Sequence, residues 1–444
     1  MAERKFLNNS ANWRALGARP PGHSVRWAHV LAVLAMALGT FLPIGGLAAT
    51  VQATGTVNHT GLVPWTPRLD TPRVQSGSVE DIVQWGDRIV LAGSFAQVTD
   101  NDSSVFNQPY LLAYDINTGA IDRSFTPSLD GAVQAVAVSP DGQSLYIAGL
   151  FNTVNGDTRR KIAKIGLDGS TVTAFTANAD SRVSAIAVSN SAVYVGGFFS
   201  SISGTARGML AALDPVTGAV DTGFDLPVTE GLGSGGLLKV HDVLLTPDGS
   251  RLVVVHSGRR VAGEIRTGAA VINTITKTLD PWSTGLYEDN LNRVGGVIRI
   301  NAADISPDGS YFVVVSGSGG DRPPISDTAV AFPVAGGAGT EPLWVSRMFD
   351  SLFSVGISEV AVYVGGHFRW QEAPGSTDPY PGDPDVNYGW DSGLGAYSLG
   401  DEVVRRDQIG AISPATGKAM NWDPGSDAGT GSNTPRQNPD SSGA

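Results

Sequence analysis

The stretch "AVYVGGFFSSISGTARGMLAALDPVTGAVDTGF", from Ala192 to Phe224, decides the fold because it recurs along the chain. A closely similar stretch, "LYIAGLFNTVNGDTRRKIAKIGLDGSTVTAF", runs from Leu145 to Phe175. Shorter versions occur at 89–98 with 111–125, and at 362–368 with 409–422. Each version alternates short runs rich in Val, Ile and Ala with turn residues, which is typical of β-strands. The chain is therefore predicted to repeat one β unit.

Six segments open in the same way, with an apolar strand, a tight turn and a second apolar strand. They begin at Val79, Val133, Val183, Val240, Ile300 and Leu352, so the starts are 54, 50, 57, 60 and 52 residues apart. Three of the turns contain Pro-Asp-Gly, where Pro presets φ and Gly accepts a positive φ. A third strand follows in each unit, and then a last short strand with an aromatic residue: Phe125, Phe175, Phe224, Trp282, Trp344 and Trp422.

Four short strands in every ~50 residues predict an all-β fold, a β-propeller of four-stranded blades over residues 57–424. We expect six blades, with seven as the alternative. The uncertainty comes from "PWTPRLD" (64–70), which resembles "SFTPSLD" (124–130) and adds a seventh closing strand to six openings. In the six-bladed form, this N-terminal strand helps to close the ring. A two-sheet sandwich does not predict six similar units at this spacing.

The repeat resembles the delta-60 repeat, a β-propeller repeat of exported bacterial proteins. The residues that carry the resemblance are Gly-x-Phe after the second strand and Leu-Ala-x-Leu-Asp-x-x-Thr-Gly in the third strand and its turn. Units one to three and six match it, over about Val79–Phe224 and Leu352–Trp422. Units four and five lack the Phe and the Asp-x-x-Thr-Gly turn. The resemblance implies a fold and an exported setting, and no activity.

The two ends of the chain are predicted to lie outside the propeller. Residues 1–27 are polar and basic, and "AHVLAVLAMALGTFLPIGGLAA" (28–49) is apolar and ends in small residues. This order is typical of a secretory signal, so we expect residues 1–53 to be a signal peptide. An uncleaved membrane anchor is the alternative, because 22 residues suffice to span a bilayer. Residues 425–444 form a polar tail that we expect to be disordered.

Composition narrows the function classes. The chain has 444 residues, no cysteine and a net charge of −12. The absence of cysteine excludes disulfides, thiolate metal sites and a cysteine nucleophile. Since residues 1–49 carry a net charge of +4, the remainder carries −16, which argues against a nucleic-acid partner. We expect a secreted or cell-surface monomer that contacts the membrane only if the N-terminal segment is uncleaved.

The opening strands contain the first candidate site. The second residue of each opening is polar in five of six units, while its neighbours are mostly apolar. These residues are Glu80, Gln134, Ser184, His241, Asn301 and Phe353. Equivalent positions of radially stacked blades converge at the axis, so we expect the six to share one ligand-binding mouth. The alternative interpretation is ordinary hydration of a central channel.

The second candidate site is a long insertion in the sixth unit, "QEAPGSTDPYPGDPDVNYGWDSG" (371–393). Its Asp383, Asp385, Asn387 and Asp391 have a spacing that resembles the start of a calcium loop. Gly389 stands at position seven instead of six, and no Glu stands at position twelve. Calcium is the one cofactor that the sequence suggests.

Two function classes follow. The favoured one is a noncatalytic exported propeller that binds a protein or a glycan at the cell surface. The alternative is a propeller enzyme, a hydrolase, lyase or lactonase, with an active site near the axis. An enzyme of this kind needs a cluster of ionisable side chains near the axis, and the sequence offers Glu80, Asp81, His241 and Asp242.

Overall fold

The computed structural model describes residues 61–64, 68, 70–100, 103–231, 237–288, 299–317, 327–348, 350–368, 370–374, 403–406 and 408–424. All secondary-structure elements of these residues are β-strands, and all sheets are antiparallel, so the predicted all-β class is confirmed. None of these residues belongs to a helix of the length and apolar character needed to cross a membrane. The predicted signal or anchor (1–53) and the polar tail (425–444) lie outside the described residues.

Six sheets, numbered here 1 to 6 in chain order, correspond to the six predicted openings. Their strands are β2 (Val79–Trp85), β3 (Arg88–Gly93) and β6 (Leu111–Asp115); β7 (Val133–Val138), β8 (Ser144–Gly149) and β11 (Ile162–Gly166); β12 (Val183–Val188), β13 (Val193–Gly197) and β16 (Leu210–Leu213); β18 (Val240–Leu245), β19 (Arg251–His256), β22 (Ala269–Asn273) and β23 (Thr278–Leu279); β24 (Arg299–Ile305), β25 (Tyr311–Gly317), β26 (Thr328–Pro333) and β27 (Trp344–Arg347); and β28 (Leu352–Ile357), β29 (Val362–Gly366) and β32 (Ile409–Ile412).

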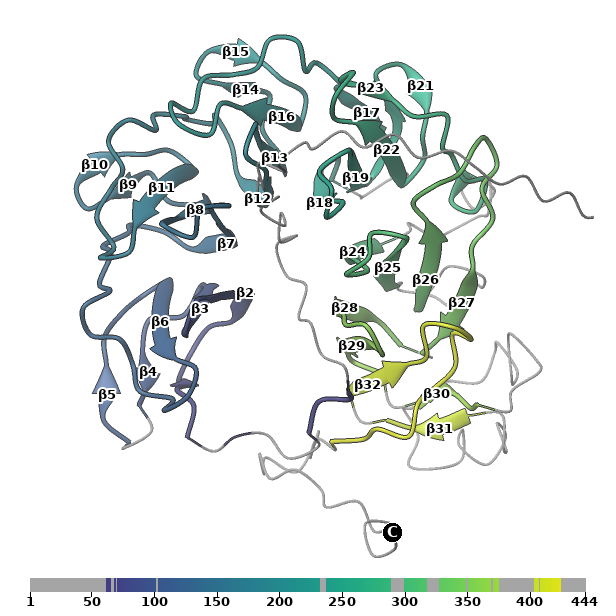
Figure 1. The fold of residues 1–444 in the computed structure, drawn as a ribbon, viewed down its shortest axis with the longest axis horizontal. Helices are drawn as coiled ribbons and strands as arrows, with labels where there is room; N and C mark the ends of the chain where they lie inside the picture. The colour runs from purple at the N-terminus through teal and green to yellow at the C-terminus, as the bar shows by residue number, and fades with distance from the viewer. Residues whose placement is uncertain are drawn as a thin grey trace, which may run out of the picture. The chain divides into compact units, whose positions relative to one another are not determined.

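Smaller sheets of two or three short strands lie beside them, mostly at the outer edge (Figure 1). They are β1 (Arg73–Val74), β4 (Val98–Thr99) and β5 (Val105–Phe106); β9 (Thr153–Val154) and β10 (Asp157–Thr158); β14 (Ser201–Ile202) and β15 (Thr205–Ala206); β17 (Val228–Gly231), β20 (Gly258–Val261) and β21 (Glu264–Ile265); and β30 (Trp370–Glu372) and β31 (Val403–Arg405).

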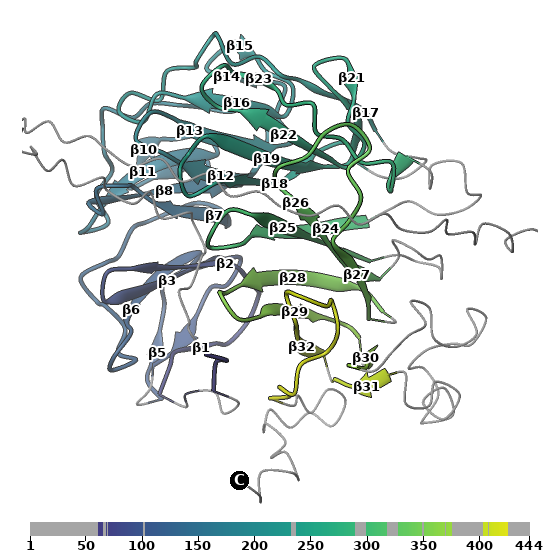
Figure 2. The ribbon, with the colours of Figure 1, turned by 45° about the vertical axis from the view of Figure 1, so that its right-hand side comes forward.

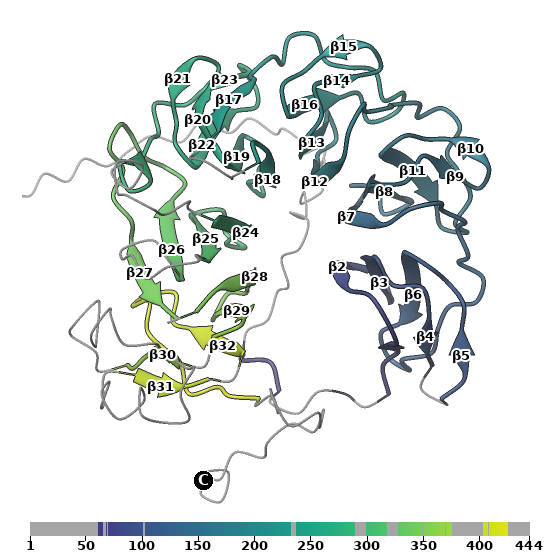
Figure 3. The same cartoon turned by 180° about the vertical axis from the view of Figure 1, so that it is seen from behind.

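The six main sheets follow one another in an arc. The first strand of each contacts the first strand of the next, in the order β2, β7, β12, β18, β24 and β28. These strands lie nearest the centre from either side (Figures 1 and 3). Sheets 4, 5 and 6 lie face to face, one above another, in Figure 2. The apolar core is divided accordingly, because five buried clusters each combine residues of two successive sheets.

The expectation of four strands in every unit is wrong for four of the six sheets. Sheets 4 and 5 have four strands, but sheets 1, 2, 3 and 6 have three and a single isolated bridge, such as Tyr114↔Ile121 in sheet 1. The reason is a second turn directly after the bridge. In sheet 1 the Asp122 carboxylate accepts the Ser124 N–H, and the Phe125 N–H donates to the Asp122 carbonyl. This turn brings Phe125 into the core without extending the strand.

Glycine after the second strand explains half of the repeat motif. A Cβ atom on Gly149 or Gly197 would lie 2.2 or 2.3 Å from the carbonyl oxygen of Ala132 or Arg182, the residue before the opening strand of the same sheet. Only glycine permits that approach without displacing the backbone. The Phe two residues later is fully buried in every matching unit: Phe95, Phe151, Phe199 and Phe368.

The N-terminal segment contacts both ends of the arc, although no strand forms in the described residues of 64–70. The Val63 N–H donates to the Tyr363 hydroxyl in sheet 6 at 3.0 Å, and Trp422 Nε1 donates to the Val63 carbonyl at 2.8 Å. The Arg68 guanidinium donates to the Asn117 carbonyl, which follows sheet 1. The described residues of the segment therefore contact the first and last sheets through side-chain hydrogen bonds, while residues 65–67 and 69 of the predicted closing strand lie outside the described residues.

Candidate functional site

The six candidate residues of the opening strands occupy the same backbone irregularity. In sheet 1, Val79 pairs with Gly93 and Asp81 pairs with Ala92, so Glu80 is an extra residue in the ladder. The first strands of the other five sheets have the same shift at the same place, and there the extra residues are Gln134, Ser184, His241, Asn301 and Phe353. A β-bulge of this kind re-aims the side chain of the extra residue. Sequence alignment of the openings found the positions, but it could not show the bulge.

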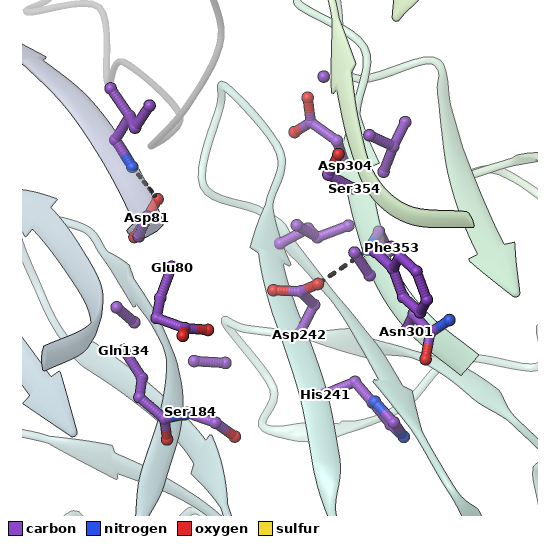
Figure 4. Close-up of a pocket in the computed structure, with 18 of the residues that line it drawn as sticks. Glu80, Asp81, Gln134, Ser184, His241, Asp242, Asn301, Asp304, Phe353 and Ser354 are labelled. Atoms are coloured by element: carbon purple, nitrogen blue, oxygen red, sulfur yellow. Dashed lines mark hydrogen bonds between the residues drawn. The ribbon is translucent and has the colours of Figure 1, made fainter. Parts of the chain in front are cut away.

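All six extra residues line one cavity of about 740 Å³. Glu80, Gln134 and Ser184 lie on one side of it, and His241, Asn301 and Phe353 lie opposite (Figure 4). The cavity also reaches β29 and β32 of sheet 6 through Tyr363 and Ile409. The structure thus brings the predicted ring residues together, and ligand binding there stays a prediction.

Two of the ring residues use their donors to hold the neighbouring sheet. The Ser184 hydroxyl donates to the Val240 carbonyl at 3.1 Å, and the Asn301 amide donates to the Leu352 carbonyl. In both cases the acceptor is the residue just before the next sheet's bulge. The bulge position therefore has a structural role as well as facing the cavity.

Two other ring residues have buried polar atoms without a hydrogen-bond partner among the described residues. They are Gln134, through Oε1, and His241, through both ring nitrogens. Burial, with Lys239 and His256 nearby, holds the pKa of His241 well below its usual range, so its imidazole is neutral at physiological pH. Buried polar groups in proteins are normally paired. These atoms are therefore the ones in the cavity wall that most need a partner.

Three aspartates on the opening strands also line the cavity and connect neighbouring sheets. Asp81 accepts the Val136 N–H at 2.8 Å, Asp242 accepts the Ala303 N–H at 2.8 Å, and Asp304 accepts the Ile357 N–H at 2.7 Å. Each bond runs from one sheet to a later one along the arc. Sequence reasoning noted Asp81 and Asp242 and missed Asp304. The signal was a carboxylate within an otherwise apolar inner strand, as in "INAADIS".

The three carboxyl groups resist ionisation. Burial raises the pKa of Asp81 to about 6, that of Asp242 to about 7 and that of Asp304 to about 8. The accepted N–H bonds oppose the shift in each case, while the negative charge of Asp81 adds to it at Asp242 and Asp304. The groups therefore respond to one another across the cavity.

No group of three or more His, Asp or Glu residues with metal-binding geometry occurs in the described part of the chain. The proposed calcium ligands Asp383, Asp385, Asn387 and Asp391 lie outside the described residues, so calcium stays a prediction.

No protein-family model matches this chain, and no curated protein matches its sequence. The site is therefore interpreted from its own geometry.

Proposed function

We propose that the chain is an exported six-bladed β-propeller of the delta-60 repeat type that binds a protein or a glycan at the cell surface through its axial cavity. The observation that carries this proposal is the bulge. Six sheets place an extra residue at the same point of the first strand, and all six side chains line one cavity. A fold that repeats a re-aimed side chain around a concave site is suited to recognition.

Closure of the ring is part of the proposal. The outer faces of the first and last sheets are both apolar, with Leu91, Leu112 and Ile121 on sheet 1 and Ala361, Ala411 and Trp422 on sheet 6. The segment at 61–70 contacts both sheets. We infer that these two faces approach each other and complete the ring without a seventh blade.

Binding is favoured over catalysis because the carboxyl groups already have structural partners. Raised pKa values of Asp242 and Asp304 are a feature of general acids, which is the observation in favour of a hydrolase, lyase or lactonase. However, each of these carboxyl groups accepts a backbone N–H of another sheet. Turnover of a substrate that is lost in Asp242→Asn, with binding retained, would favour the enzyme instead.

The proposal is tested with the chain from residue 54 onward, screened against glycans and cell-surface proteins. For any ligand found, Glu80→Ala combined with His241→Ala should weaken binding by about tenfold or more, which corresponds to about 1.4 kcal/mol. The matched control is Gln84→Ala, an exposed position of the same strand β2 that does not line the cavity. Unchanged affinity of the double variant would place the binding site elsewhere on the chain.

A further inference from the structure

The wall of the cavity offers mainly hydrogen-bond acceptors. The Ser184 hydroxyl donates to the Val240 carbonyl and one N–H of the Asn301 amide donates to the Leu352 carbonyl, which leaves the hydroxyl lone pairs, the amide oxygen and one amide N–H. Gln134 Oε1 is buried and has no partner among the described residues. Neutral His241 adds one acceptor nitrogen and one N–H, both unpartnered within the described chain. The wall therefore combines acceptors with a smaller number of donors, and its unpartnered atoms on Gln134 and His241 are buried.

The charge of the wall is acidic. Four carboxyl groups line the cavity, those of Glu80, Asp81, Asp242 and Asp304, against one ammonium, that of Lys239. The Lys239 Nζ lies 5.6 Å from the centroid of the Phe198 ring, which does not line the cavity. Asp242 has one oxygen that accepts the Ala303 N–H, and its second oxygen has no bond to the described residues. Because burial raises the pKa of Asp242 to about 7 and that of Asp304 to about 8, the wall becomes more negative as these groups ionise, and a positively charged ligand would stabilise their ionised forms.

Comparison among the sheets shows that the fold does not require these carboxylates. Ala135 of sheet 2 and Ala185 of sheet 3 stand at the position of Asp81 and Asp242, two residues after the start of the strand. Sheets 2 and 3 nevertheless pack against their neighbours through continuous buried clusters. Burying a carboxylate is costly, and at Asp242 the single accepted N–H leaves the second oxygen for a ligand.

An aromatic ring completes the wall. Phe353 is 48% exposed, and its ring contacts that of His367 edge-on, with centroids 4.7 Å apart. An exposed aromatic ring beside carboxylates is a common environment for an organic cation, because the ring face attracts positive charge.

We propose that the cavity binds a protonated amine, with the ammonium facing Asp81 and Asp242 and Phe353 beside its carbon skeleton. The inference rests on the proposed binding function and specifies its ligand class. Two sources share this chemistry, namely an amino sugar of a surface glycan and a lysine side chain of a protein.

Amine binding should release a proton from the cavity, and a purely structural role of Asp242 would not produce this release. Because burial raises the pKa of Asp242 to about 7, a bound cation should favour its ionised form and release a proton near neutral pH. The other titratable groups of the wall are Glu80, Asp81, Lys239, His241, Asp304 and Tyr363. Amine binding should therefore weaken as pH falls from 8 to 5.5, while an amine with a pKa above 9 stays protonated.

The experiment compares matched probes by titration calorimetry at pH 8 and pH 5.5. The probes are a glucosamine oligomer against its N-acetylated form, and Nα-acetyl-lysine methylamide against the same molecule acetylated at Nε. We expect the charged probe of at least one pair to bind, its neutral analogue to bind about tenfold or more weakly, and binding at pH 7 to release protons in buffers of different ionisation enthalpy. The pair that responds identifies the source.

Variants locate the effect. Asp81→Asn and Asp242→Asn keep an acceptor for the backbone N–H and remove the charge, so each should weaken binding of the charged probe about tenfold. Asp157→Asn, an exposed position outside the cavity, is the control and should bind as the wild type does. Should Asp242→Asn fail to fold, Asp81→Asn and the pH series of the wild type still decide.

The two proposals fail differently. If a neutral glycan binds as tightly as its amine counterpart and Glu80→Ala with His241→Ala abolishes that binding, the axial site stands and the amine inference is overturned. If an amine binds with no change in Asp81→Asn and Asp242→Asn, the inference is overturned as well. If the cavity variants affect no ligand of the chain, the axial binding function itself is wrong.

Discussion

Sheets 2 and 3 follow the repeat motif closely, whereas sheets 4 and 5 depart from it. Both pairs nevertheless have the same backbone path. Sheet 3 has Gly197 at the end of its second strand, and sheet 4 has the fully buried His256 at the same ladder position. The bulge in the first strand is nevertheless common to both pairs. The fold therefore depends on the bulge and the turns, and the motif is one way to form them.

A second shared feature lies directly before the third strand. One residue there adopts a left-handed conformation in every one of the six sheets, although only one of the six is glycine. These residues are Tyr110, Lys161, Met209, Gly268, Asp327 and Gln408, with φ between 55° and 78°. Such a conformation costs a non-glycine residue about 1 kcal/mol. Its recurrence in unlike residues shows that the backbone path, more than the residue type, is the repeated element.

The pairs differ in the charge of their inner strands. Directly after the bulge, sheets 2, 3 and 5 have Ala135, Ala185 and Ala302, whereas sheet 4 has Asp242. Sheet 5 has its carboxylate, Asp304, two residues further along the strand. The carboxyl groups of the cavity thus come from sheets 1, 4 and 5, and sheets 2 and 3 contribute none.

The largest expected effect concerns the motif Phe. Phe199 is fully buried, and sheet 4 has Gly258 at the equivalent position, two residues after its second strand's last ladder pair. Phe199→Ala should lower the free energy of unfolding by about 3–5 kcal/mol, because it removes a large side chain from a closed core. Urea unfolding followed by tryptophan fluorescence measures this loss.

The control is the neighbouring Phe198→Ala, because Phe198 is only partly buried and its ring centroid lies 4.1 Å from the Arg182 Cζ atom. We expect a loss of about 1 kcal/mol there. Equal losses of stability at both positions would mean that Phe199 is no more important to sheet 3 than its neighbour Phe198. The difference between Phe199 in sheet 3 and Gly258 in sheet 4 would then have no consequence for stability.

The next effect concerns the buried carboxyl groups of sheets 4 and 5, which sheets 2 and 3 lack. The folded state retains protons on Asp242 and Asp304 up to pKa values of about 7 and 8, whereas the unfolded chain releases them near the ordinary value of 3.8. The free energy of unfolding should therefore fall as pH rises from 6 to 8, by about 2 kcal/mol or more. Carboxylates with lowered pKa values, such as Asp115 and Asp214, lose their contribution only in acid.

Asp242→Asn combined with Asp304→Asn should flatten this dependence between pH 6 and 8, since the amide oxygens still accept the backbone N–H groups and no charge develops. Asp157→Asn serves as the control because Asp157 is exposed in β10. An unchanged slope in the double variant would mean that these two carboxyl groups are not the source of the dependence.

Sequence patterns predicted the elements of this molecule better than its irregularities. The openings at Val79 and Val133 became first strands because alternation of apolar residues and turn chemistry act locally. The strand count failed in sheet 1 because the hydrogen bonds of Asp122 end the fourth strand after one bridge. The raised pKa of Asp304 was not predictable either, since it depends on burial among other sheets.

The third-strand turn gives an example of a motif that changes its letters and keeps its geometry. In sheet 3, Asp214 accepts the N–H groups of Val216 and Thr217. In sheet 4, Asn273 accepts those of Ile275 and Thr276 in the same way. Unit four lacks the Asp-x-x-Thr-Gly residues, as its sequence shows, but it keeps the turn because the amide oxygen of Asn273 replaces the carboxylate.

The smallest expected effect lies at the last residue of that turn. Lys277 has φ of 58° where sheet 3 has Gly218 with φ of 75°. Lys277→Gly would relieve the left-handed strain of about 1 kcal/mol, but it adds freedom to the unfolded chain and removes the ion pair of Lys277 with Asp221 at 2.6 Å. Because these contributions oppose one another, the free energy of unfolding should change by less than about 1 kcal/mol.

The matched substitution is Gly218→Ala, where the new Cβ would lie 2.7 Å from the backbone nitrogen of Ala177, so a loss of about 2 kcal/mol is expected. Urea midpoints of the two variants, measured at low salt and at 1 M salt, show whether glycine is needed at this position for its left-handed φ or for the close approach of Ala177. Equal losses would show that the left-handed turn alone selects glycine, and that sheet 4 tolerates Lys277 only through its ion pair.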